Sequence, residues 1–400
     1  MAASRDNPIT TTTISERMRR QFHRDGFLVM PNGTLKQILI STHLESTASL
    51  ETEDVEILQR EADCLINYLI SENINIMTDY GGIIEPITCG YIDPPVSQMF
   101  ILSKKSYSHV RDQVPEEPDS VLHILFEKVP AMVRNFLPLE SEDDPTCLFN
   151  EQYIVKTPNS ADVSSFEWHQ DSQYMDTSAQ ETFPIVSCWI ALDNVNLMNG
   201  TLLVEPFPRP KDAATGGYID PPTQFHGRDT YVRYHKHLAS NYVNPPSNKM
   251  TAIMKAQHRQ PLQPPPLSSP SAVGARGTAV DTLPNNPKEW VYESQPPVLV
   301  EVPTGSIVFL SGWVRHCSLG NSSSKFRRAF MPQYSAGKVV TATGGMVSLA
   351  VPCNEYDERE REWVDPLGRK QNQGDELIDD DDGFGRTDDL DFGDDVDMED

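Results

Sequence analysis

Cysteine is scarce in this sequence and never closely paired. None of the six cysteines stands in a Cys-x-x-Cys pair. This spacing argues against a zinc ribbon and against a disulfide framework. It favours a reducing compartment, and we therefore expect a cytoplasmic protein. The six are Cys64, Cys89, Cys147, Cys188, Cys317 and Cys353.

Long apolar runs and targeting signals are also missing. No stretch of about 18 apolar residues occurs, so we expect no membrane-spanning helix. The opening residues MAASRDNPITTTT lack an apolar core, and we expect no secretory signal. The closing residues DVDMED match neither a peroxisomal nor an endoplasmic-reticulum address.

A basic footprint, which nucleic-acid binding needs, is absent as well. The net charge is −25, and residues 371–400 carry 14 acids and one Arg, or −13, which leaves −12 for the other 370 residues. We expect residues 353–400 to form a disordered acidic tail, because such a composition buries too little surface to fold alone. It serves either to solvate the protein or to dock a basic partner.

Helical patterns occupy the first part of the chain. Residues 13–16 (TISE) read as a capping box that starts a short helix, and Gly26 stops it. The residues GFLVMP that follow predict a strand. Residues 52–71 and 121–136 carry apolar residues at helical spacing. Both segments are therefore predicted to be amphipathic helices that pack on a core.

From about residue 150 the pattern becomes that of an antiparallel β-rich domain. Short runs such as EQYIVK, IVSCWIALD and SIVFLSGW are rich in β-branched and aromatic residues and are separated by Pro, Gly and Asn. This is typical of a sandwich or barrel. The sequence thus predicts a mainly β domain with flanking helices over residues 15–352, after a flexible N-terminus (1–14).

A proline-rich segment interrupts the strands. Residues 206–297 hold 16 of the 32 prolines, and the segment is too long for an ordinary loop. We expect an insertion over about 207–297 that is partly disordered or acts as a lid. His235 and His237 lie inside it with no carboxylate or Cys close by. We interpret them as part of an exposed polar segment rather than a second metal site.

Two His-x-Asp triplets invite a metal interpretation. His23 and Asp25 lie at the end of the predicted first helix, where residues two apart point to different faces, so we interpret this triplet as a helix end. His169 and Asp171 lie in FEWHQD, which has strand-like flanks. Residues two apart on a strand share a face. This pair therefore supplies two thirds of a 2-His-1-carboxylate triad, the ligand set of non-haem Fe(II) sites.

The third ligand has one good candidate. An apolar run, IVFL, leads through Gly312 to His316, and a polar turn then brings back a strand that begins with Arg327 and Arg328. One of these two arginines should point into the same cavity. A buried guanidinium needs an anionic partner, and it binds a carboxylate with two hydrogen bonds. The far carboxylate of 2-oxoglutarate fits this requirement.

These motifs, in this order, resemble the phytanoyl-CoA dioxygenase family of Fe(II)- and 2-oxoglutarate-dependent oxygenases. The resemblance covers about 16–206 and 298–338. It implies a double-stranded β-helix (jelly roll) and selects the arginine eleven residues after the distal His. The matching segments are RRQFHRDGFLVMPN, the WHQD around His169, WIALD with the later NGTLL, and HCSLGN, which starts at His316.

The resemblance also implies site roles. His169, Asp171 and His316 would hold Fe(II), and Arg327 would bind the 2-oxoglutarate cosubstrate. Trp189 and Lys156 fall where the family often places further cosubstrate contacts. The alternatives are core packing for Trp189 and a surface position for Lys156.

We therefore expect a dioxygenase that uses Fe(II), 2-oxoglutarate and O2 to hydroxylate a small lipid-, acyl- or secondary-metabolite-like substrate. Two alternatives stay open. One is an inactive oxygenase-fold protein that binds a partner through its acidic tail. The other is a cupin-like metalloenzyme that does not use 2-oxoglutarate. The segment PFPR after Glu205 departs from the family pattern and leaves the substrate undefined.

Overall fold

The structure is a computed structural model. The chain divides into two units, residues 1–356 and 357–400, and all residues described here lie in the first. The predicted acidic tail, apart from Cys353, and most of the predicted flexible N-terminus lie outside the described residues. These are 14–32, 50–84, 121–141, 144–174, 184–222, 225, 227–242, 290–337, 339–340, 347–348 and 351–353.

The predicted N-terminal helix and strand are present as α1 (Glu16–Asp25) and β1 (Phe27–Met30). The hydroxyl of Ser15 caps α1 by accepting the Met18 N–H (3.3 Å). Gly26 ends the helix at φ 81°, a left-handed conformation that suits glycine. The capping position is therefore Ser15, whereas Thr13 lies outside the described residues.

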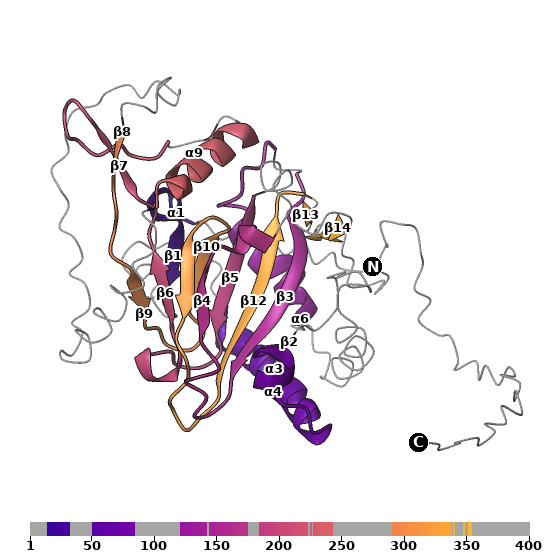
Figure 1. Ribbon diagram of the computed structural model, residues 1–400. Helices are drawn as coiled ribbons and strands as arrows, with labels where there is room; N and C mark the ends of the chain where they lie inside the picture. Colours follow the sequence, from indigo (N-terminus) through magenta and orange to yellow (C-terminus); the bar gives the residue numbers. More distant parts are fainter. Residues whose placement is uncertain are drawn as a thin grey trace, which may run out of the picture. The chain divides into compact units, whose positions relative to one another are not determined.

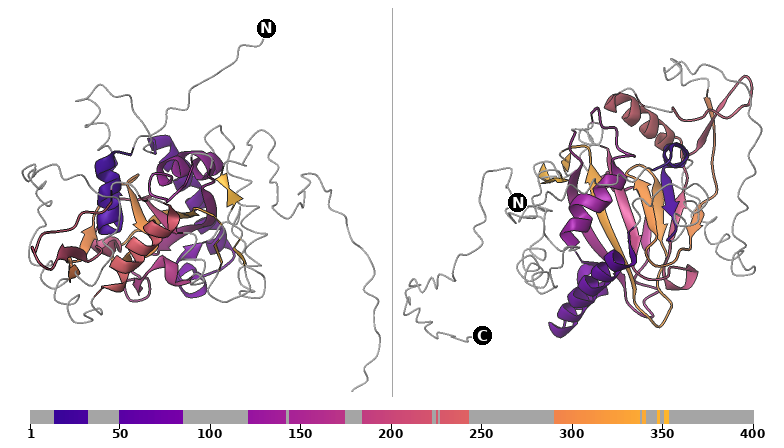
Figure 2. Two further views of the ribbon diagram at one scale, coloured as in Figure 1. Left: turned by 90° about the horizontal axis from the view of Figure 1, so that it is seen from above. Right: turned by 180° about the vertical axis from the view of Figure 1, so that it is seen from behind.

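Helices cover one face of the domain, as the apolar spacing predicts. The predicted helix over 121–136 runs from 121 to 133, with a π-helical middle portion. Tyr153 donates its hydroxyl to Glu61 of the helix over 52–71 (3.0 Å), and Tyr334 donates to the Leu125 carbonyl of the helical segment 121–133 (2.7 Å). Each helical segment is therefore hydrogen-bonded to a strand. Figure 2 shows them on the outside of the larger sheet. Their bounds are α3 (Thr52–Ser71), α4 (Ile76–Tyr80), α6 (Val121–His123), η1 (Ile124–Lys128) and α7 (Val129–Val133).

The larger sheet has seven antiparallel strands in the order β1-β10-β5-β12-β3-β15, with β2 also paired to β3. Its strands come from both ends of the chain, and they lie side by side in Figure 1. The remaining bounds are β2 (Ile83–Ile84), β3 (Cys147–Lys156), β5 (Ile185–Ala191), β10 (Ile307–Ser311), β12 (Arg327–Ser335) and β15 (Val351–Pro352).

The smaller sheet has four antiparallel strands in the order β4-β11-β6-β9. Two short 3-10 turns adjoin it, and a separate pair is formed by β13 and β14. The antiparallel, mainly β prediction is confirmed. The bounds are β4 (Phe166–His169), η2 (Asp171–Tyr174), η3 (Leu197–Asn199), β6 (Leu202–Glu205), β9 (Val298–Val300), β11 (Arg315–Ser318), β13 (Val339–Val340) and β14 (Val347–Ser348).

The proline-rich insertion contains regular structure. β7 (Arg209–Asp212) pairs with β8 (Trp290–Glu293), and between them runs α9 (Arg228–Ser240). His235 on α9 is fully buried, so the expectation of an exposed polar segment is wrong. Tyr231, Tyr234 and Leu238 share this buried face, and aromatic burial at helical spacing explains why the segment folds onto the domain.

Candidate metal centre

His169 is the last residue of β4, and Asp171 begins the turn η2. The expectation that both stand on one continuous strand is therefore wrong for Asp171. The backbone turns here because Ser172 N–H donates to the Gly312 carbonyl (2.9 Å). The Gln170 amide also donates to the Trp313 carbonyl (2.5 Å). The segment is thus tied to the turn between β10 and β11.

That turn leads into β11, which carries His316. His316 and His169 are direct partners across the β4–β11 pair. Their ring centroids lie 4.3 Å apart with the rings tilted by 57°. Two residues separated by 147 positions are thus neighbours because their strands pair.

The three predicted ligands converge. The Asp171 Oδ1 atom lies 3.6 Å from the His169 Nε2 atom and 3.6 Å from the His316 Nε2 atom. All three ligand atoms lie within 4.8 Å of one another. Adjacent ligands placed about 2.1 Å from one ion lie about 3 Å apart, so small movements suffice to bind one. Among the described residues this is the only such group of three His, Cys, Asp or Glu side chains.

Both imidazoles are oriented for metal binding. The His169 Nδ1 lies 2.7 Å from the Glu167 carbonyl, and the His316 Nδ1 lies 3.3 Å from the Val314 carbonyl. Since a carbonyl only accepts, each Nδ1 carries the hydrogen and each Nε2 keeps its lone pair. Burial lowers the pKa of His316, which favours the neutral ligand form.

Behind Asp171 stands Ser187, which the sequence reasoning did not single out. Its hydroxyl donates to the Asp171 Oδ2 atom at 2.5 Å. Ser187 is fully buried on β5. A serine within the apolar strand IVSCWIA was the available signal, because a buried hydroxyl requires a partner.

Arg327 lies at the start of β12 and is fully buried. All three of its side-chain nitrogens lack a hydrogen-bond partner among the described residues. Burial lowers the pKa of its guanidinium to about 9. The charged group lies 5.7 Å from the ring of Trp189, whose indole N–H also lacks a partner in the described part of the chain. These orphan donors fit an absent anion.

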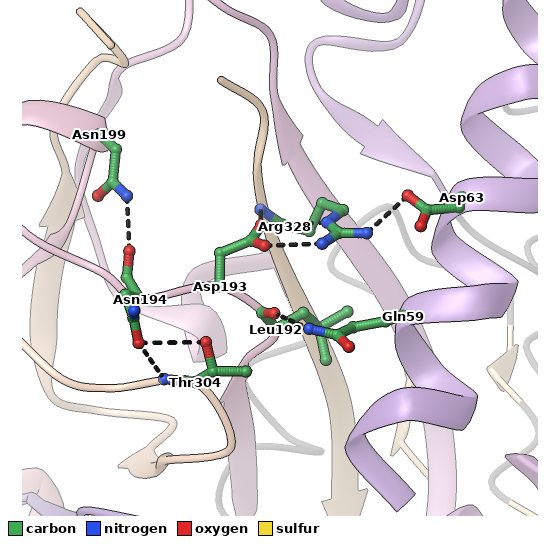
Figure 3. A network of polar contacts seen from close by, with 8 residues as sticks. All are labelled: Gln59, Asp63, Leu192, Asp193, Asn194, Asn199, Thr304 and Arg328. Carbon is green, nitrogen blue, oxygen red and sulfur yellow. Dashed lines mark hydrogen bonds and ion pairs between the residues drawn. The ribbon is translucent and has the colours of Figure 1, made fainter. Parts of the chain in front are cut away.

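Arg328 takes the opposite side of the strand. Its guanidinium forms two hydrogen bonds with Asp193, at 3.1 and 2.7 Å, and one with Asp63 of α3 at 2.6 Å. Figure 3 shows this network, in which Gln59 of α3 also reaches the Leu192 carbonyl. Arg328 therefore fastens a helix to the sheet, and Arg327 is the arginine that points inward.

Lys156 is fully buried, which excludes the alternative of a surface position. It is the direct partner of Arg327 across the β3–β12 pair. Its amine donates to the Ser318 hydroxyl (2.8 Å) and to the carbonyls of Ser164 and Leu319. Burial, with a further contribution from Arg327, lowers the pKa of Lys156 to about 6. The amine thereby joins β3 to the smaller sheet, two residues beyond His316.

The second triplet forms no metal group. His23 instead faces His235, with 3.3 Å between its Nδ1 atom and the His235 Nε2 atom. The Asp25 carboxylate forms an ion pair with Arg24, with 2.7 Å between the Asp25 Oδ2 and Arg24 Nη2 atoms. The interpretation of this triplet as a helix end agrees with the end of α1 at Asp25, although His23 also contributes a buried contact.

Fold and site together define a two-sheet antiparallel β protein with a candidate centre for a single metal ion. A family model of phytanoyl-CoA dioxygenase (PhyH) matches residues 22–329. The match covers more than half of the chain, and the protein belongs to this family. The chain has no match among curated proteins. None of the helices in the described segments is both long and apolar enough to cross a bilayer.

Several solved structures are similar to this chain at low sequence identity. AviO1 from Streptomyces viridochromogenes Tue57 is 16% identical, covering 81% of this chain and 96% of that one, with a TM-score of 0.38. EvdO2 from Micromonospora carbonacea var. aurantiaca, complexed with 2-oxoglutarate, is 16% identical. The match covers 87% of this chain and 99% of that one, with a TM-score of 0.39. SnoN, a non-heme alpha ketoglutarate dependent epimerase from nogalamycin biosynthesis, is 12% identical. The match covers 86% of this chain and 96% of that one, with a TM-score of 0.39.

Proposed function

We propose that this protein is an Fe(II)- and 2-oxoglutarate-dependent dioxygenase that hydroxylates a C–H bond of a small organic substrate. The observation that carries the proposal is Arg327, a fully buried guanidinium with three unpartnered nitrogens. An uncompensated buried charge is costly, so this residue calls for an anion. Family membership and the convergence of His169, Asp171 and His316 support the same function.

His169, Asp171 and His316 would hold the ion through two neutral nitrogens and one carboxylate oxygen, the donor set suited to Fe(II). Arg327 would bind the far carboxylate of 2-oxoglutarate, and the unpartnered N–H of Trp189 offers one more donor beside it. Lys156 would support this end of the site through Ser318. When bound, Fe(II) and 2-oxoglutarate would supply the activation of O2, with release of succinate and CO2.

We further propose that the two sheets form a double-stranded β-helix, with the oxygenase domain extending over residues 15–352. Support comes from the antiparallel pairing and from His169 and His316 meeting on the smaller sheet. Trp189 lies two residues after Ser187 on β5 and therefore shares the face from which Ser187 reaches Asp171, and Arg327 lies beside Trp189. The substrate would enter between the sheets and lie beside the metal.

The test is an anaerobic titration of the purified protein with Fe(II) and then 2-oxoglutarate. The expected result is a weak visible charge-transfer band that is lost in His169→Ala and strongly weakened in Arg327→Ala. Arg328→Ala is the matched control, because it removes a neighbouring guanidinium that faces Asp193 and Asp63. This variant should keep the band.

The alternatives give different results. A folded protein that binds no iron would refute the oxygenase proposal and favour a binding protein that acts through its acidic tail. Iron binding without any response to 2-oxoglutarate would favour a metalloenzyme of the cupin kind. If the band is present, succinate release under air then identifies substrates among lipid-, acyl- and secondary-metabolite-like compounds.

A further inference from the structure

We propose that Ser187, held in place by Gln333 and Asn150, is a positioning residue that makes Asp171 bind the metal through one oxygen only. The inference rests on the proposed function, because it concerns the same metal centre. It concerns three polar residues that lie in one row across the larger sheet.

The row consists of direct cross-strand partners. Asn150 on β3 pairs with Gln333 on β12, and Gln333 pairs with Ser187 on β5. The Asn150 amide donates to Gln333 Oε1 (3.0 Å), and the Gln333 amide donates to Ser187 Oγ (2.9 Å). Ser187 then donates to Asp171 Oδ2. Ser187 and Gln333 are 0% and 5% exposed, so the two residues nearest to Asp171 in this row are shielded from water.

This chain of hydrogen bonds has one direction. An amide nitrogen only donates, so the Ser187 oxygen accepts from Gln333, and its single hydrogen is left for Asp171. The ionised carboxylate only accepts. The Gln333 orientation is fixed in turn because its oxygen accepts from Asn150. Three strands therefore combine to aim one hydroxyl at one carboxylate oxygen.

The two carboxylate oxygens of Asp171 therefore have different partners. Oδ2 faces Ser187, while Oδ1 lies 3.6 Å from both ligand nitrogens. Binding the ion through both oxygens would pull Oδ2 away from Ser187 and leave a buried hydroxyl without its acceptor, which is costly. A one-oxygen Asp171 and two histidines would hold the ion through three donor atoms and leave room for cosubstrate and O2.

The test replaces Fe(II) by cobalt(II), whose visible spectrum reports the number of ligands, under anaerobic conditions. We expect Ser187→Ala to weaken cobalt(II) binding about 10- to 100-fold, the usual effect of losing a group that orients a ligand. Its spectrum should shift relative to the wild type. Ser187→Thr keeps the hydroxyl and should restore both the affinity and the spectrum.

Ser335→Ala is the matched control. Ser335 is also a buried serine on the larger sheet, but its hydroxyl donates to the Gly337 carbonyl. This variant should bind cobalt(II) as the wild type does. If Ser187→Ala does not fold, Gln333→Leu tests the same chain one step back, and a several-fold weaker affinity is expected.

The outcomes separate the two proposals. A wild-type protein that binds no cobalt(II) overturns the proposed function together with this inference. A wild type that binds, with Ser187→Ala or Gln333→Leu unchanged in affinity and spectrum, overturns this inference alone. An equal loss in Ser335→Ala also overturns it, because the effect would then reflect general stability.

Discussion

The buried imidazole pair between α1 and α9 should make the protein sensitive to mild acid. His23 is 8% exposed and His235 is fully buried. Burial is the main cause that lowers the pKa of His23 to about 3, and Arg19 adds to it. Burial likewise lowers the pKa of His235 well below its ordinary value, with His23 contributing. The rings around the pair, Phe225 and Tyr231 among them, carry no charge to compensate a proton.

The sign follows from proton binding. An unfolded histidine takes up its proton near pH 6.5, but folded His23 does so only near pH 3, so the unfolded state binds more protons between these values. The contribution of His23 to the free energy of unfolding is fully present above about pH 6.5 and is lost progressively as the pH falls toward about 3. At about pH 5 the loss from His23 is about 1.5 pH units multiplied by about 1.4 kcal/mol, or about 2 kcal/mol.

Urea unfolding, followed by tryptophan fluorescence between about pH 7.5 and about pH 5, measures this loss. Over this range the free energy of unfolding should fall by about 2 kcal/mol less in the double variant His23→Leu/His235→Phe than in the wild type. A contribution from His235 would make this difference larger. His123→Gln is the control, because it removes a histidine outside the pair, whose ring lies 3.2 Å from the Glu127 carboxylate. Equal pH slopes in the wild type and the double variant would refute the reasoning.

Three further predictions concern single residues. Trp189→Phe keeps the packing but removes the unpartnered indole N–H, and it should raise the Kd for 2-oxoglutarate about 5-fold in an anaerobic titration. Gly200→Ala should lower the free energy of unfolding by about 2 kcal/mol or more, since an added Cβ would lie 2.6 Å from the Leu319 carbonyl oxygen, at a φ of +90°; a thermal melt checks it. Arg328→Ala should cost about 1–3 kcal/mol of stability through the lost bonds to Asp193 and Asp63, with no change in 2-oxoglutarate affinity.

The strands and the position of His316 could be predicted because each depends on a short local pattern. Strand-like runs divided by turn residues mark β10 and β12, and His316 lies between them. The register across three strands cannot be predicted in this way. Gln333 meets Ser187 and Asn150 only because β12 pairs with both β5 and β3. Gln333 lies 183 positions after Asn150 and 146 after Ser187, and no local pattern encodes the match.

Two features were missed because the prediction relied on the average behaviour of residue types. The proline-rich segment was predicted to be an insertion that is partly disordered or acts as a lid, and its residues 243–289 lie outside the described residues. The helix α9, which contains no proline, was missed because composition averaged over a long segment concealed it. Lys156 was given a surface alternative because lysine is seldom buried. Its inward direction follows from pairing with Arg327, and three acceptors satisfy its amine. In both cases tertiary contacts outweighed the average behaviour of the residue type.

The insertion contributes to the metal centre through the turn that α9 covers. His235 and Tyr231 of α9 pack on Trp313, at ring distances of 6.0 and 6.5 Å. The Trp313 carbonyl accepts the Gln170 amide, so one turn fixes both the segment beside His169 and the strand of His316. Because buried rings of α9 pack on Trp313 of this turn, we expect α9 to stay fixed to the domain. Removing α9 should therefore disturb metal binding itself, beyond any effect on substrate entry.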